Sequence, residues 1–133
     1  MKFLKYFELR NSFRKVDLQS LYLSFKKYRG KNLNEFKEIV LKPLLLNKYI
    51  SSNNGRFSGT VTEIDIYKNK EIEKNIEIYL WITPDNCVNS ESQETIFISS
   101  YQTTPYYIFI LNSEETEFEK DLEMYKTGKK YNL

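Results

Sequence analysis

The sequence predicts a single α+β domain spanning residues 1–133, in which N-terminal helices pack on one face of a four-stranded antiparallel meander sheet and a further helix follows at the C-terminus. Two observations predict this class. Between Phe57 and Leu111, polar and apolar residues alternate in short runs rich in β-branched and aromatic residues, which is typical of strands. On either side of this block, apolar residues recur every three or four positions, which is typical of helices that bury one face.

Turn-forming residues divide the central block into four predicted strands. They are Val61–Lys68, Asn75–Thr83, Glu94–Ser100 and Pro105–Leu111. The connections between them are polar, and Gln102–Thr104 is short enough for a tight hairpin. Because consecutive strands usually pair with one another, an antiparallel meander is the simplest topology.

The two faces of the predicted sheet differ in chemistry, because side chains alternate between faces along a strand. One face is nearly all isoleucine and leucine and needs the helices as a cover; in the first strand the alternation places Thr62 on this face and Val61 on the other. The opposite face combines large aromatic side chains with carboxylates. Its candidate partner-binding residues are Glu63, Asp65, Tyr67, Glu77, Tyr79, Trp81, Phe97, Tyr107 and Phe109.

This aromatic and acidic composition has two interpretations. Unpaired carboxylates are rarely buried, and protein-binding surfaces are enriched in aromatic residues, so the face is a candidate docking surface for another protein. The alternative is that a second layer of the same chain covers the rings while the acids lie at the rim of the sheet.

Helix signals flank the strands. Leu18–Arg29 carries an apolar stripe with Asp17 as a candidate N-cap and Gly30 as a candidate terminator. A second helix begins at Asn32, with Glu35 at the capping-box position, and either ends near Val40 or restarts with Pro43 in a new first turn.

The remaining segments carry weaker signals. Met1–Val16 fits a helix or a short strand, and we favour a helix. Ser51–Gly55 is a loop by composition. The last helix is expected to begin at Asn112, with Glu115 at the capping position, and to end at Gly128.

The composition argues against several kinds of active site. The chain has no histidine, which removes the commonest general base and metal ligand, and its single cysteine, Cys87, can form no intrachain disulfide. Its four glycines are scattered singly, so no phosphate-binding loop is present. We therefore expect no enzyme, no cofactor and no metal site.

Charge is distributed unevenly along the chain. Residues 1–50 hold twelve Lys and Arg against four acids, whereas residues 63–123 hold fourteen acids against four lysines. Such asymmetry steers binding partners. The sequence also has no apolar segment long enough to span a membrane and no secretory signal, so we expect a soluble cytoplasmic protein.

These observations favour a small protein-binding module. The main hypothesis is an inhibitor or immunity protein that neutralises a basic partner, such as a toxin nuclease, through the aromatic and acidic face. One alternative is nonspecific nucleic-acid binding through the basic N-terminal helices; another is a cone-shaped α+β domain that binds a small molecule. A homodimer formed through the aromatic face would show the same surface pattern.

Overall fold

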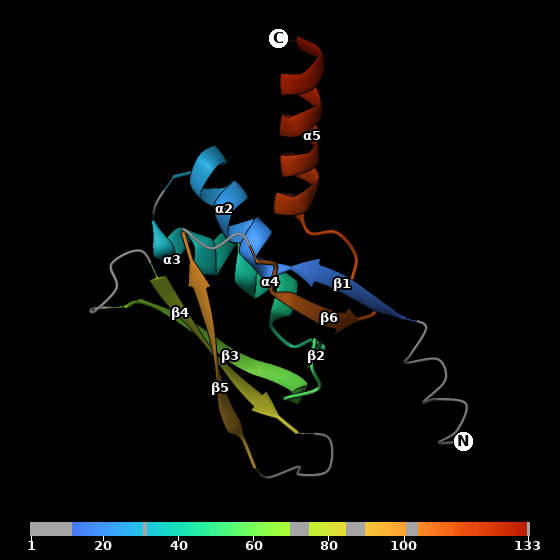
Figure 1. The fold of residues 1–133 in the computed structure, drawn as a ribbon. Coiled ribbons are helices and arrows are strands. Elements are labelled where there is room, and N and C mark those ends of the chain that lie inside the picture. Colours follow the sequence, from blue (N-terminus) through green and yellow to red (C-terminus); the bar gives the residue numbers. More distant parts are fainter. Residues whose placement is uncertain (1–11, 31, 70–74, 85–89, 101–103, 133) are drawn as a thin grey trace.

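The structure, a computed structural model, describes residues 12–30, 32–69, 75–84, 90–100 and 104–132 (Figure 1). Six strands and several helical segments form an α+β fold with an antiparallel sheet and a C-terminal helix. In chain order the elements are β1 (Phe13–Asp17), α2 (Leu18–Tyr28), α3 (Leu33–Glu35), the π-helical segment η1 (Phe36–Leu41), α4 (Lys42–Leu45), β2 (Tyr49–Ser52), β3 (Ser58–Lys68), β4 (Asn75–Thr83), β5 (Ser92–Ser99), β6 (Tyr107–Leu111) and α5 (Glu117–Asn132).

The sheet has six strands in the order β1-β6-β2-β3-β4-β5, so the prediction of a four-stranded meander is wrong in number. The meander holds from β2 to β5, where consecutive strands are antiparallel neighbours. It fails at β6, which pairs with β1 and β2 instead of β5. A hairpin at Gln102–Thr104 is therefore excluded, although residues 101–103 themselves lie outside the described part of the chain.

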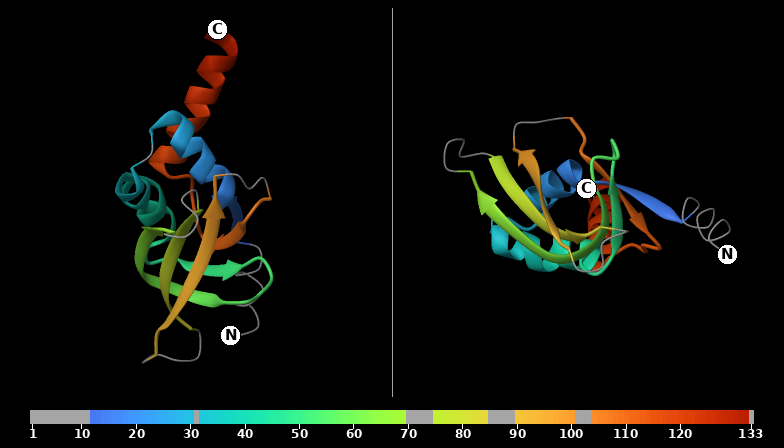
Figure 2. Two further views of the ribbon diagram at one scale, coloured as in Figure 1. Left: turned by 60° about the vertical axis from the view of Figure 1, so that its left-hand side comes forward. Right: turned by 90° about the horizontal axis from the view of Figure 1, so that it is seen from below.

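The inner face of the curved sheet forms the core. Ile76, Ile78, Leu80 and Ile82 of β4 are almost fully buried, as the alternation predicts. The helices supply aromatic side chains to the same cluster: the Phe25 ring of α2 lies 5.2 Å from the ring of Phe36 and 5.9 Å from the ring of Phe118. Figure 2 shows the curvature of the sheet from two further directions.

A β-bulge at the start of β3 reverses the faces that the sequence predicts for Val61 and Thr62. The register between β3 and β4 shifts between Val61 and Glu63, so that Thr62 is the extra residue. Val61 consequently points inward and is buried, whereas Thr62 is exposed, the reverse of the simple alternation. From Glu63 onward the predicted faces are correct.

The first predicted helix is confirmed as α2. The Asp17 side chain accepts a hydrogen bond from the Ser20 backbone N–H, and Gly30 follows the helix with a φ of +121°. Met1–Val16 was expected to be helical, but Phe13–Asp17 is the edge strand β1, and residues 1–11 lie outside the described residues. Ser51–Gly55 is also only partly a loop, because β2 extends to Ser52.

The second helix begins where the sequence predicts and, of the two predicted alternatives, it continues past Val40 with Pro43 in a new first turn. The Asn32 side chain accepts hydrogen bonds from the backbone N–H groups of Asn34 and Glu35. Residues 36–41 then widen into a π-helix, and Pro43 lies in the first turn of α4. Because proline has no N–H and its ring clashes with the carbonyl four residues earlier, the wider turn accommodates Pro43 without ending the helix.

Helix α5 begins later and runs further than predicted. Asn112 has a φ of +50° and does not cap it; instead Thr116 and Glu119 form a reciprocal capping box, each side chain accepting from the other's backbone N–H. The helix continues through Gly128, which lacks the left-handed conformation of a helix terminator. Phe118 and Leu122 are buried, the Tyr125 ring lies 4.3 Å from that of Tyr28, and the C-terminal end of α5 projects away from the body of the molecule (Figure 1).

Candidate functional site

The outer face of β3, β4 and β5 carries seven of the nine predicted site residues in three rows. The register places Tyr67 opposite Glu77 and Glu77 opposite Phe97, which makes the first row. The second row is Asp65, Tyr79 and Thr95, and the third is Glu63, Trp81 and Gln93. We call these nine residues the outer grid. In every row an aromatic side chain therefore lies directly opposite a carboxylate of the neighbouring strand, and all of these carboxylates belong to β3 and β4.

Each tyrosine of the grid donates its hydroxyl to a carboxylate two positions earlier on the same strand. Tyr67 Oη lies 2.6 Å from Asp65 Oδ2, and Tyr79 Oη lies 3.1 Å from Glu77 Oε2. The hydrogen bond to Asp65 raises the pKa of the Tyr67 phenol above its usual value, and the bond to Glu77 does the same for Tyr79. Both phenols are thus held neutral, as fixed donors to the acids.

The Asp65 carboxylate receives further support from the backbone and from a helix. Its Oδ1 accepts a hydrogen bond from the Ile66 backbone N–H at 2.9 Å and lies 3.6 Å from Lys37 Nζ of η1. The hydrogen bond from Tyr67 is the largest influence on the Asp65 pKa, and together with the Ile66 and Lys37 contacts it lowers that pKa despite partial desolvation. Asp65 is consequently an ionised and fully engaged group.

The aromatic rings of the grid pack against one another and remain accessible. The ring centroids of Tyr67 and Tyr79 are 5.2 Å apart, and those of Tyr79 and Trp81 are 6.4 Å apart. Tyr67 is 49% exposed and Phe97 is 55% exposed, while Tyr79 and Trp81 are half-buried. In the part of the chain that the structure describes, the rings are therefore not enclosed by a second layer.

Tyr107 and Phe109, the other two predicted site residues, do not join the grid. They lie on β6, which is separated from β3 by β2. Phe109 lies between Lys15 of β1 and Ser51 of β2, and the Lys15 ammonium lies 3.9 Å from the centroid of the Tyr107 ring. This second aromatic patch already has a cation of its own chain on one ring.

A hollow of about 440 Å³ lies at the end of the grid nearest the β3–β4 connection. It is open to solvent, and the side chains that line it are Tyr67, Lys68, Asn69, Glu77 and Tyr79. Sequence reasoning missed the contributions of Lys68 and Asn69, and also of Gln93 and Thr95 in the grid. The alternation places Thr95 on the same face as Phe97, but Thr95 is not among the predicted site residues. Gln93 lies before the predicted strand Glu94–Ser100, because β5 begins earlier, at Ser92, and the hollow depends on the register.

Part of the charge asymmetry of the sequence is neutralised by ion pairs within the chain. Arg14 pairs with Glu119, Arg29 with Asp121 and Lys37 with Asp65, so cations of the first 50 residues meet acids of the second half. Lys26 of α2 donates to Ser100 Oγ. By contrast, Glu63 and Glu77 of the grid form no ion pair with any residue that the structure describes.

No family model matches the sequence, and no curated protein or solved structure is significantly similar to it. Over the described residues, no helix has the length and apolarity needed to cross a membrane. Nor do three Cys, Asp or Glu side chains of these segments gather where they could hold a metal ion. Cys87 lies outside the described residues.

Proposed function

We propose that this chain is a non-catalytic protein-binding module that docks a cationic partner on the outer grid. The observation that supports the proposal is that aromatic rings of three adjacent strands lie beside the carboxylates of β3 and β4 on one face that no other described layer covers. Aromatic side chains provide contact area that loses little conformational entropy on binding, and carboxylates provide orientation and steering. A sheet holds these groups rigidly, so little ordering is required when the partner arrives.

The size of the grid indicates how far such an interface extends. Three strands and three rows span roughly 10 Å by 14 Å between outer Cα atoms, from strand spacing and rise. A stable interface buries about 800 Å² on each partner and involves some 20 to 30 residues a side. The grid therefore fits the centre of an interface, and the partner would also contact the exposed residues that surround it.

The partner class follows from the sign of the charge. Glu63 and Glu77 present carboxylates that no described cation neutralises, so the complementary surface is positive. Proteins that cleave or bind nucleic acids carry such surfaces because they must contact phosphates. We propose that the partner is a basic protein of this kind, such as a toxin nuclease, and that the chain acts in the cytoplasm as its inhibitor or immunity protein.

The alternatives raised by the sequence have less support. On the N-terminal helices, Arg29 pairs with Asp121 and Lys26 donates to Ser100 Oγ, so part of the basic charge available to phosphates is already engaged. A small-molecule site that used a grid carboxylate as an acid would raise its pKa, and the pKa of Asp65 is lowered. A dimer formed through the grid is treated below as an outcome of the test.

Site-specific photocrosslinking tests the proposal. A photoreactive phenylalanine analogue replaces Phe97 in the grid or, as a control, Met124 of α5, which is also apolar and is 73% exposed. We expect the probe at position 97 to capture a basic protein, with a yield that falls as salt rises. The probe at position 124 should not capture that protein. Identical products from both positions would contradict the proposal, as would capture at position 97 of only a second copy of this chain.

A further inference from the structure

The hollow beside Tyr67 and Tyr79 carries an inference that rests on the proposed function and specifies how the partner is recognised. We propose that this hollow receives the cationic side chain of a lysine or arginine of the partner, whose charge lies against Glu77 and whose apolar stem contacts the two tyrosine rings. The proposal identifies the chemistry of one anchor residue of the partner.

The first argument is the distribution of carboxylate oxygens around the hollow. Both oxygens of Asp65 are engaged, Oδ1 by Ile66 and Lys37 and Oδ2 by Tyr67. At Glu77 the Tyr79 hydroxyl donates to Oε2 only. Glu77 Oε1 accepts no hydrogen bond from the residues that the structure describes, so Glu77 supplies the negative charge that the hollow offers to a ligand.

The second argument is the arrangement of the rings. Tyr67 and Tyr79 both line the hollow, with centroids 5.2 Å apart and planes inclined by 60°. The faces of aromatic rings attract cations, and an adjoining carboxylate adds to the attraction. Lysine and arginine side chains also carry apolar stems that pack on such rings while the charged end stays solvated. A hollow of about 440 Å³ is large enough for one such side chain.

The hollow is lined by a cation, Lys68, as well as by the Glu77 carboxylate, so the sign of the ligand charge must be tested. An anion would use Lys68 and Asn69, but the two phenol hydroxyls already donate to carboxylates and Glu77 would repel it. For a cation the roles reverse: Glu77 attracts and Lys68 repels. Substitutions at Glu77 and Lys68 must therefore change the affinity in opposite directions.

The experiment uses the chain's own fluorescence. Trp81 is the only tryptophan, and its ring centroid lies 6.4 Å from that of Tyr79. The full chain is titrated at low salt with blocked peptides that contain three lysines, three arginines or three glutamines. We expect a saturable change in Trp81 emission with a cationic peptide and none with the glutamine peptide.

Variants then test the sign. Glu77→Gln should weaken binding of the cationic peptide about 3-fold or more, and Lys68→Ala should strengthen it about 2-fold, which corresponds to exposed charge contacts of roughly 0.4 to 0.7 kcal/mol. Matched controls on α5 are Glu123→Gln and Lys120→Ala, which change the net charge equally; they should leave the affinity within about 1.5-fold of wild type.

Four results would overturn the inference: no binding of either cationic peptide, equal binding of the glutamine peptide, equal effects of Glu77→Gln and Glu123→Gln, or weaker binding in Lys68→Ala. These failures are distinguishable from failure of the proposed function. If no peptide binds the hollow but the probe at Phe97 still captures a basic protein, the docking face stands and the anchor assignment falls. If the probe captures nothing basic, the docking face itself is wrong.

Discussion

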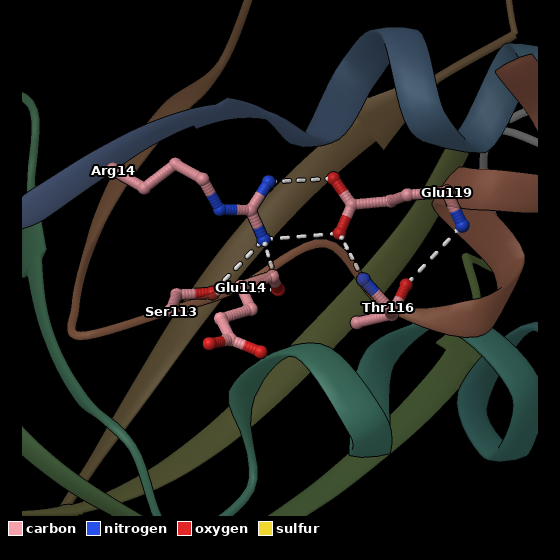
Figure 3. A network of polar contacts seen from close by, with 5 residues as sticks. All are labelled: Arg14, Ser113, Glu114, Thr116 and Glu119. Carbon is pink, nitrogen blue, oxygen red and sulfur yellow. Dashed lines mark hydrogen bonds and ion pairs between the residues drawn. The ribbon is translucent and has the colours of Figure 1, made fainter.

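Arg14 of β1 and Glu119 of α5, which are 105 residues apart in the sequence, form a two-pronged ion pair that joins the sheet to the C-terminal helix. Arg14 Nη1 lies 2.7 Å from Glu119 Oε2, and Arg14 Nη2 lies 3.0 Å from Glu119 Oε1. The second nitrogen also donates to Ser113 Oγ and to the Glu114 carbonyl (Figure 3). Glu119 Oε1 also accepts a hydrogen bond from the Thr116 backbone N–H. This one carboxylate therefore joins the start of α5 to the edge strand of the sheet.

Replacement of Glu119 should destabilise the fold. The side chains of Arg14 and Glu119 are only 25% and 15% exposed, so Glu119→Gln leaves a largely buried guanidinium without its counterion. We expect the free energy of unfolding at pH 7 to fall by roughly 1–3 kcal/mol. Urea titration measures this change, and Glu123→Gln, an exposed position of the same helix, serves as a control that should change it little.

The same variant has a defined pH dependence. Burial alone raises the pKa of Glu119, but hydrogen bonds from Arg14 and Thr116 outweigh it and hold the pKa below the usual 4.5. The carboxylate therefore stabilises the native state above pH 4.5, and this contribution is lost as the pH falls through the lowered pKa. The difference between wild type and Glu119→Gln should shrink on acidification; a constant difference would contradict this assignment.

Gly59 of β3 should be the least replaceable glycine in the described chain. It has a φ of +149°, and a Cβ at this position would collide with the Thr83 carbonyl and the Ile82 side chain of β4. We expect Gly59→Ala to reduce the free energy of unfolding by roughly 2–4 kcal/mol. Thermal melts of the variant and of the wild type measure this loss. Gly128→Ala is the matched control: a Cβ at Gly128 meets nothing within 4 Å, and because the residue is helical the substitution should leave the stability unchanged or raise it slightly.

The Tyr67 hydroxyl should control the protonation of Asp65. Its hydrogen bond is the largest influence on the lowered Asp65 pKa, so Tyr67→Phe should raise that pKa toward the usual 3.8. NMR titration of the Asp65 side-chain carboxyl carbon measures the effect directly. Tyr79→Phe removes a phenol that donates to Glu77 instead, and should leave the Asp65 pKa unchanged. Equal shifts in both variants would indicate that the Tyr67 contact does not form in solution.

Signals from residues close together in the sequence correctly predicted two helix starts and the two faces of β4. Asp17 and Asn32 cap the helices that the sequence assigned to them, and the alternation in β4 correctly separates its buried isoleucines from its outward aromatic residues. The sequence also contains the actual start of α5, because Thr116 and Glu119 have the capping-box spacing; the prediction rests on Asn112 and Glu115, which have the same spacing, and does not consider the later pair.

Long-range pairing could not be predicted in the same way. Alternation shows that Ile108 and Ile110 of β6 are buried, but it does not show which strands lie beside them. The structure places Ile110 opposite Ile50 of the unpredicted strand β2, and Tyr107 and Phe109 are thereby moved away from the grid. The bulge at Thr62 has no composition signal for a similar reason: it is defined only by the register with β4.

The most direct test of the docking face is a double variant, Trp81→Ala with Glu77→Lys, compared with Met124→Ala with Glu123→Lys on α5. Both remove one large apolar side chain and reverse one charge, and circular dichroism establishes that each remains folded. We expect the grid variant to lose binding to the basic protein captured through position 97, while the α5 variant binds it like the wild type. Undiminished binding by the grid variant would contradict the central claim that the aromatic and acidic face of β3, β4 and β5 recognises the partner.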